Sequence, residues 1–181
     1  SSDWSSDVCS SDLSFLKDHG ITVVHVVASV KFALKSQEAG VDAVVAEGFE
    51  AGGHNGADET TTMVLIPQVK EAIDIPLIAA GGIASGRAML AAMALGADGV
   101  QIGSRFAASE ESSGPANFKK AIVEATEGST ILTLKKVVPV RLIKNSFYRQ
   151  VQEAEDGGAG RMELMKILGR ARAKRGMFEG D

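Results

Sequence analysis

Between residues 21 and 102 short β-branched runs alternate with segments of helical periodicity, and this alternation constrains the fold most strongly. The first run, Ile21–Ala28, is too apolar on both alternating faces for a half-exposed strand. Further strands are predicted at Val41–Ala46, Ile75–Ala80 and Gly99–Ile102. Because buried strands separated by helices form parallel sheets, the sequence predicts consecutive parallel β-α units.

Three helical segments separate these strands. Val30–Ala39 and Gly86–Leu95 have helical spacing, and each is followed by a glycine suited to a helix C-terminus. Between them, Pro67 is predicted to lie in the first turn of a helix that runs to about Ile73.

The spacing of the strands indicates a barrel. Their centres lie near residues 24, 44, 78 and 100. A complete (β/α)8 barrel needs eight such units and typically about 250 residues. The predicted fold class is therefore α/β: the C-terminal half of a TIM barrel with four parallel β-α units, followed by a mainly helical C-terminal segment. A small open α/β fold is the alternative.

The two ends of the chain differ from this central region. Residues 1–13 repeat Ser-Ser-Asp three times without a structural period, which predicts disorder. Because a common sequencing adapter can encode Asp7–Leu13, we interpret residues 1–13 as a translated adapter artefact. The half barrel is predicted at residues 14–109 and a truncated helical extension at 110–181. Within the extension, helices are predicted at Asn117–Glu127 and Arg161–Gly169, and a strand or extended connection at Ser129–Leu134.

Composition excludes several classes of protein. No apolar run reaches the roughly 18 residues of a membrane span, and a single Cys excludes a disulfide scaffold. The net charge of −4 argues against nucleic acid as the main partner. The bases between Lys166 and Arg175 fit a solvated helix end, with nucleic-acid or membrane binding as the alternative. Without a secretory signal, the expected location is the cytoplasm. With three histidines, no zinc site is expected.

A histidine among glycines stands out in the loop after the second strand. His54 follows Gly52 and Gly53, so a ligand can approach its ring and the neighbouring backbone amides. An ordinary histidine, with a pKa of about 6.5, can accept or donate a proton near neutral pH. A loop histidine that merely caps backbone groups is the alternative.

Two further loops follow the third and fourth strands. Gly81 and Gly82 lie in one, and Gly103 and Ser104 in the other. Barrels often bind phosphate with the backbone amides of two such loops. Each glycine pair alone would also suit a tight strand–helix turn.

These motifs resemble the nitronate monooxygenase family, and the type II enoyl-acyl-carrier-protein reductases are close relatives. The motifs are AEGFEAGGHNG at Ala46–Gly56, TTTMVLIPQV at Thr60–Val69, IPLIAAGGIASGRAM at Ile75–Met89 and LGADGVQIGSRFAASEES at Leu95–Ser112. The resemblance covers about Phe15 to Asp181 and implies a TIM barrel that holds FMN.

The resemblance also implies roles for individual residues. His54 matches the family's active-site histidine, near the reactive edge of the flavin. The matching cofactor-binding positions are Glu47, Gly52, Gly53, Ala80, Gly81, Gly82, Gln101, Gly103 and Ser104. No metal ligand is implied.

Two reactions are implied by this resemblance, both of them oxidoreductase chemistry with a small-molecule substrate. In the first, O₂ oxidises an alkyl nitronate. In the second, NAD(P)H reduces an enoyl thioester. A homodimer is expected of the full-length protein, meaning the product in which both barrel halves are joined. A truncated chimeric product without activity of its own is a third interpretation.

We predict that the 181-residue chain alone expresses poorly and does not retain FMN. A half barrel exposes two strand edges and an apolar interior, which favours aggregation. Expression and visible absorbance of the purified chain check this prediction. A soluble yellow monomer with bound flavin would contradict it.

Overall fold

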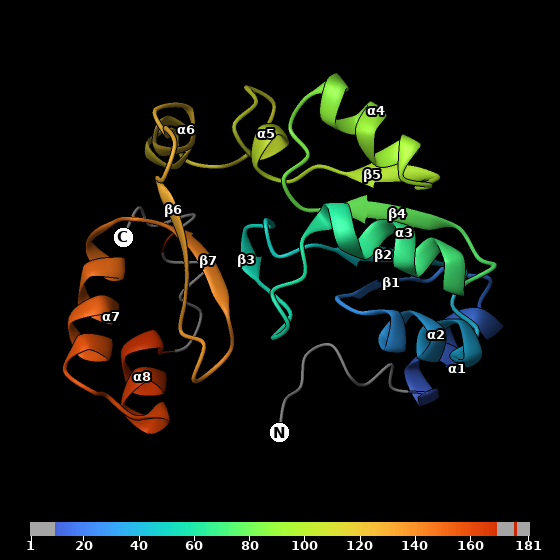
Figure 1. Ribbon diagram of the computed structural model, residues 1–181, viewed down its shortest axis with the longest axis horizontal. Coiled ribbons are helices and arrows are strands. Elements are labelled where there is room, and N and C mark those ends of the chain that lie inside the picture. Colours follow the sequence, from blue (N-terminus) through green and yellow to red (C-terminus); the bar gives the residue numbers. More distant parts are fainter. Residues whose placement is uncertain (1–9, 170–175, 177–181) are drawn as a thin grey trace. The chain divides into compact units, whose positions relative to one another are not determined.

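The computed structural model describes residues 10–169 and residue 176 (Figure 1). The chain divides into two compact units. Unit 1 consists of Ser1–Ala51 and Asp58–Ile102, and unit 2 consists of Gly52–Ala57 and Gly103–Asp181. The domain limits predicted from sequence, 14–109 and 110–181, stay predictions.

Unit 1 contains a parallel sheet of four strands in the order β1-β2-β4-β5. The strands are β1 (Val24–Val27), β2 (Ala43–Glu47), β4 (Leu77–Ala80) and β5 (Gly99–Gln101). All three neighbouring pairs are parallel, which confirms the predicted arrangement. The observed strands are shorter than the apolar runs that predicted them.

Helices connect these strands and pack against them. α2 (Val30–Ala39) contacts β1 and β2, α3 (Thr62–Ala72) contacts β2 and β4, and α4 (Gly86–Ala94) contacts β5 (Figure 1). Between the sheet and its helices lies a core that includes Val44, Ile66 and Leu77, all fully buried. Each helix therefore connects two parallel strands as a β-α-β crossover, and all three helices pack against the same core.

The predicted position of Pro67 in its helix is wrong. Pro67 lies inside α3, because the side chain of Thr61 caps the helix by accepting a hydrogen bond from the backbone N–H of Val64. The helix consequently begins five residues before the proline. Proline removes one intrahelical hydrogen bond there, and burial of neighbouring Leu65, Ile66 and Val69 offsets that cost.

The predicted disorder of residues 1–13 is wrong for its last four residues. Ser10–Asp18 form helix α1, and Leu13 is buried at 5% exposure in the core of unit 1. A single apolar side chain gave no periodicity in the sequence, but its burial anchors the helix. The rest of this segment, residues 1–9, lies outside the described residues. The adapter origin stays a prediction.

Unit 2 combines helices with a small antiparallel sheet of order β3-β7-β6. Its core contains Leu134, Phe147, Val151 and Leu164. The strands are β3 (Gly53–His54), β7 (Val140–Ile143) and β6 (Thr130–Thr133), and the helices are α5 (Ser104–Ala107), α6 (Ala116–Val123), α7 (Ser146–Asp156) and α8 (Arg161–Leu168). The sequence predicted neither β3, in the glycine-rich loop after β2, nor β7, within the mainly helical segment, because their pairing joins residues far apart in sequence. The basic residues 170–175 lie outside the described residues.

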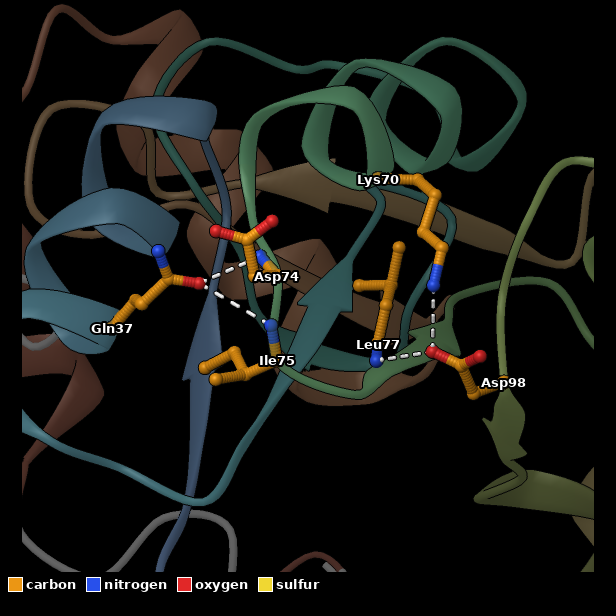
Figure 2. Close-up of polar contacts among 6 residues, drawn as sticks. All are labelled: Gln37, Lys70, Asp74, Ile75, Leu77 and Asp98. Carbon is orange, nitrogen blue, oxygen red and sulfur yellow. Dashed lines mark hydrogen bonds and ion pairs between the residues drawn. The ribbon is translucent and has the colours of Figure 1, made fainter.

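Polar side chains bind backbone amides where the strands of unit 1 begin. Asp98, just before β5, accepts hydrogen bonds from the Leu77 amide at 2.9 Å and from Lys70 Nζ at 3.0 Å (Figure 2). Gln37 Oε1 accepts from the amides of Asp74 and Ile75 at 2.8 and 3.3 Å.

Asp42 makes the same kind of contact between β1 and β2. It directly precedes β2 and accepts a hydrogen bond from the Val23 amide at 2.7 Å, while pairing with Lys17. The amide of Leu77, and then Lys70, hold the pKa of the Asp98 carboxyl below its ordinary value. Neighbouring parallel strands are therefore tied together at their amino ends.

Replacing Asp98 with Ala should lower the free energy of unfolding of the full-length protein at pH 7 by about 1 kcal/mol or less, because the pair is half-exposed. The pKa of the Asp98 carboxyl is lower in the folded protein than in the unfolded chain, where it is about 3.9. The carboxylate therefore stabilises the fold above about pH 3.9, and this stabilisation is lost as the pH falls through the folded-state pKa. The difference in free energy of unfolding between Asp98→Ala and wild type should therefore shrink as the pH falls below about 4.

Urea unfolding at several pH values measures this difference. Asp74→Ala is the matched control, because only its backbone amide makes a hydrogen bond in Figure 2. An Asp98→Ala penalty that persists undiminished near pH 2 would contradict the assignment.

Candidate functional site

Three of the residues predicted to bind a cofactor form one row at the carboxyl ends of the parallel strands. Glu47 is the last residue of β2, Ala80 of β4 and Gln101 of β5. The sheet register pairs Glu47 with Ala80, and Ala80 with Gln101. Barrel enzymes place their sites at this edge of the sheet.

Glu47 places a carboxyl group in this row. Its side chain is partly buried, and burial raises the pKa of the carboxyl above its ordinary value. None of the side-chain hydrogen bonds or ion pairs found among residues 10–169 involves this carboxyl. A half-buried carboxyl of this kind can hydrogen-bond a polar ligand.

The turns after β2 and β4 pack against each other with no spare space. The Gly48 amide donates to the Ala80 carbonyl at 3.0 Å. A Cβ atom on Gly48 would lie 2.2 Å from Thr62 Oγ1, and one on Gly81 would lie 2.8 Å from the Gly48 carbonyl oxygen. Gly81 also has a φ of +105°, which L side chains rarely adopt. Glycine is required at both positions for the two backbones to approach.

Glu50 and Thr62 complete this contact, and the sequence analysis missed both. The Thr62 amide donates to Glu50 Oε2 at 2.9 Å, and Thr62 Oγ1 lies 3.0 Å from the same oxygen. Thr62 Oγ1 also lies 2.9 Å from the Gly81 carbonyl. The run of threonines before a helical segment is a helix-start signal that could have drawn attention to Thr62.

Backbone amides at the two predicted phosphate loops are available to a ligand. Among the hydrogen bonds of residues 10–169, none has the amide of Gly81, Gly82, Gly103 or Ser104 as its donor. Gly82 and Gly103 are exposed. A backbone N–H needs an acceptor, from water or from a ligand, so these amides can bind an anion.

The other predicted residues belong to unit 2. His54 lies in β3 opposite Val140 of β7, and it is exposed. Gly53, before it, has a φ of +91° and open space where a Cβ would stand. A Cβ on Gly52 would lie 3.9 Å from Ser104 Oγ, so these two predicted residues are brought together.

The predicted site residues thus divide between the two units. The first unit holds one group, consisting of Glu47, Ala80, Gly81, Gly82 and Gln101. The second unit holds the other, consisting of Gly52, Gly53, His54, Gly103 and Ser104. Among the described residues, no group of three or more His, Cys, Asp or Glu could hold a metal ion. No helix in the same ranges is long and apolar enough to cross a membrane.

Comparison with known proteins identifies the family. The family model described as nitronate monooxygenase matches residues 8–180. The chain belongs to the nitronate monooxygenase family. A "probable nitronate monooxygenase" of Staphylococcus saprophyticus is 40% identical over 153 residues, which are 78% of this chain and 42% of that protein.

Solved structures agree with this assignment. FabK from Thermotoga maritima has a TM-score of 0.86 and 43% identity, covering 95% of this chain and 54% of that one. Nitroalkane oxidase from Streptomyces ansochromogenes has a TM-score of 0.72 and 30% identity, covering 93% and 53%. Both are TIM barrels, which confirms the predicted fold class of a partial barrel. The chain spans about two fifths of the length of the curated relatives it matches.

Replacing Gly48 with Ala should destabilise the full-length protein by about 3 kcal/mol. The added Cβ would lie 2.2 Å from Thr62 Oγ1 and 2.4 Å from the Thr62 amide nitrogen, so the turn must move. Gly86→Ala is the control, since a Cβ there meets nothing within 4 Å. Urea unfolding measures both variants, and equal stability of the two would contradict the close approach.

Proposed function

We propose that the full-length protein is an FMN-dependent nitronate monooxygenase that oxidises alkyl nitronates with O₂. The observation that carries this proposal is the row of Glu47, Ala80 and Gln101 at the strand ends. Two of these three strands are followed by turns whose glycine amides have no acceptor among residues 10–169. Family membership supports the same assignment.

The chemistry of the available donors fits the phosphate of FMN. In unit 1, the amides of Gly81 and Gly82 would hold its oxygens. In unit 2, the amides of Gly103 and Ser104 and the Ser104 hydroxyl are donors of the same kind. Glycine leaves no side chain between the backbone and such a ligand. The two turns follow strands that are direct neighbours in the sheet, as in barrels whose last two loops bind phosphate.

Each unit offers one further polar side chain, Glu47 in unit 1 for the cofactor and His54 in unit 2 for the substrate. The Glu47 carboxyl, which has no assigned protein partner in the described part of the chain, would bind hydroxyl groups of the cofactor's sugar-alcohol chain. The exposed His54 ring would donate an N–H to an oxygen of the anionic nitronate and so fix its orientation.

Electron transfer is the chemistry that bound FMN supplies, with O₂ as the final oxidant. The residues of this chain would bind the cofactor, orient the substrate and place charged groups beside both. Because Gly52 and Gly53 carry no side chains beside His54, a planar ligand can approach the imidazole closely.

A second reaction is the NAD(P)H-dependent reduction of an enoyl thioester. The likeness to FabK at 43% identity supports this candidate. Anaerobic mixing of the full-length protein with NAD(P)H separates the two reactions. Rapid flavin bleaching, followed by turnover of an enoyl thioester, would favour the reductase. A flavin that stays oxidised with NAD(P)H but turns over nitronate and O₂ would favour the monooxygenase.

Replacing His54 with Ala should leave FMN bound and lower kcat/KM for a nitronate by about 100-fold or more, as expected for loss of a positioned polar group. Oxygen consumption with an alkyl nitronate measures the change. His19→Ala is the control histidine, since His19 lies just beyond α1 and bonds the Phe15 carbonyl. Full turnover by His54→Ala would contradict the role of His54.

A further inference from the structure

We propose that Glu50 is a positioning residue of the cofactor site. Its carboxylate, bound at the start of α3, holds the turn Gly48–Ala51 after β2 in register with the turn Ala80–Gly82 after β4. In this way it presets the amides of Gly81 and Gly82 for the phosphate. This inference rests on the proposed binding of FMN at that edge of the sheet.

The first observation is the bond between Glu50 and the helix. Both carboxylate oxygens accept from the Thr62 amide, at 2.9 and 3.2 Å. Thr62 is the first residue of α3, where amides have no intrahelical acceptor and where the helix dipole favours negative charge. Thr61, the N-cap of the same turn, accepts from the Val64 amide, so Glu50 and Thr61 satisfy different amides of this helix start.

The second observation is that Thr62 connects Glu50 to the turn after β4. Its hydroxyl lies 3.0 Å from Glu50 Oε2, 2.9 Å from the Gly81 carbonyl and 3.3 Å from the Ala80 carbonyl. Thr62 is buried at 8% exposure, so water cannot easily replace these partners. One buried hydroxyl therefore joins the loop that contains Glu50 to the turn that contains the predicted phosphate donors.

The third observation is that the stem of Glu50 packs on the same turn. A Cβ on Gly82 would lie 3.2 Å from Glu50 Cβ and 3.7 Å from Glu50 Cγ. Gly82 has a φ of +69°, and Gly81 one of +105°, so this turn adopts a conformation reserved for glycine. Contact with Glu50 restricts the turn that glycine alone would leave flexible.

The negative charge of Glu50 has a second effect, on the binding of other anions at the start of α3. Its carboxylate already binds the amino end of α3, so the helix terminus is closed to another anion by occupancy and by repulsion. The amides of the glycine turn, by contrast, have no acceptor among the described residues and stay available to a phosphate. Glu50 thus occupies the helix terminus and fixes the turn that would hold the phosphate.

Titration of the full-length apoprotein with FMN and with riboflavin, followed by flavin fluorescence, tests this inference. Riboflavin lacks the phosphate, so the ratio of the two affinities reports on the phosphate cradle alone. Glu50→Ala should weaken FMN binding at least tenfold, which corresponds to about 1.4 kcal/mol, and should change riboflavin binding much less. A merely structural defect would weaken both ligands equally.

Two further variants keep the test decisive if Glu50→Ala does not fold. Thr62→Val removes the hydroxyl bridge, and Glu50→Gln retains one oxygen that can accept from the Thr62 amide. Both should lower the FMN-to-riboflavin affinity ratio, with Glu50→Gln the milder. In the double variant Glu50→Ala/Thr62→Val, the loss of FMN-binding free energy should be smaller than the sum of the losses in the two single variants. The reason is that the two residues act through one contact.

Glu71→Ala is the matched control, an exposed glutamate in the last turns of the same helix, α3. It should leave both affinities unchanged. Wild-type protein that does not bind FMN would overturn the proposed function and this inference with it. Wild-type protein that binds FMN, with an unchanged FMN-to-riboflavin ratio in all Glu50 and Thr62 variants that fold, would overturn the role of Glu50 alone.

Discussion

The buried hydroxyl of Thr62 is the contact on which the carboxyl edge of the sheet depends. It lies within hydrogen-bond distance of Glu50 and of the carbonyls of Ala80 and Gly81. Three segments distant in sequence therefore meet at one side chain. A single hydroxyl proton serves one acceptor at a time, so the arrangement is held by the Thr62 amide and by close packing as well.

The two edges of the parallel sheet differ in whether protein side chains satisfy their backbone amides. At the amino edge, Asp42, Gln37 and Asp98 satisfy the amides that precede or begin neighbouring strands. At the carboxyl edge the amides of Gly81 and Gly82 have no acceptor within the described ranges. This division follows the general rule for barrels, where one face provides stability and the other binds ligands.

Local patterns predicted unit 1 well because each of its elements carries its own signal. The β-branched runs, and the glycines after α2 and α4, report burial and helix ends within a few residues. Pro67 was misplaced because a side-chain cap at Thr61 set the helix start independently of the proline. Leu13 was missed because one buried side chain makes no periodic pattern.

Contacts between distant residues account for what the sequence did not reveal. The strand β3 exists only through its pairing with β7, about 87 residues later, and two residues carry no strand periodicity of their own. The contact between Glu50 and Thr62 was overlooked for the same reason: the threonine run signals a helix start, but nothing local pairs Thr62 with Glu50. The row of Glu47, Ala80 and Gln101 was predictable, because consecutive parallel strands place their carboxyl ends at one edge.

A crystal structure of the full-length protein grown with FMN tests the central claim most directly. We expect the phosphate oxygens to accept hydrogen bonds from the amides of Gly81 and Gly82, in the turn that Glu50 and Thr62 hold. A flavin phosphate held elsewhere, with water on these two amides, would contradict the account.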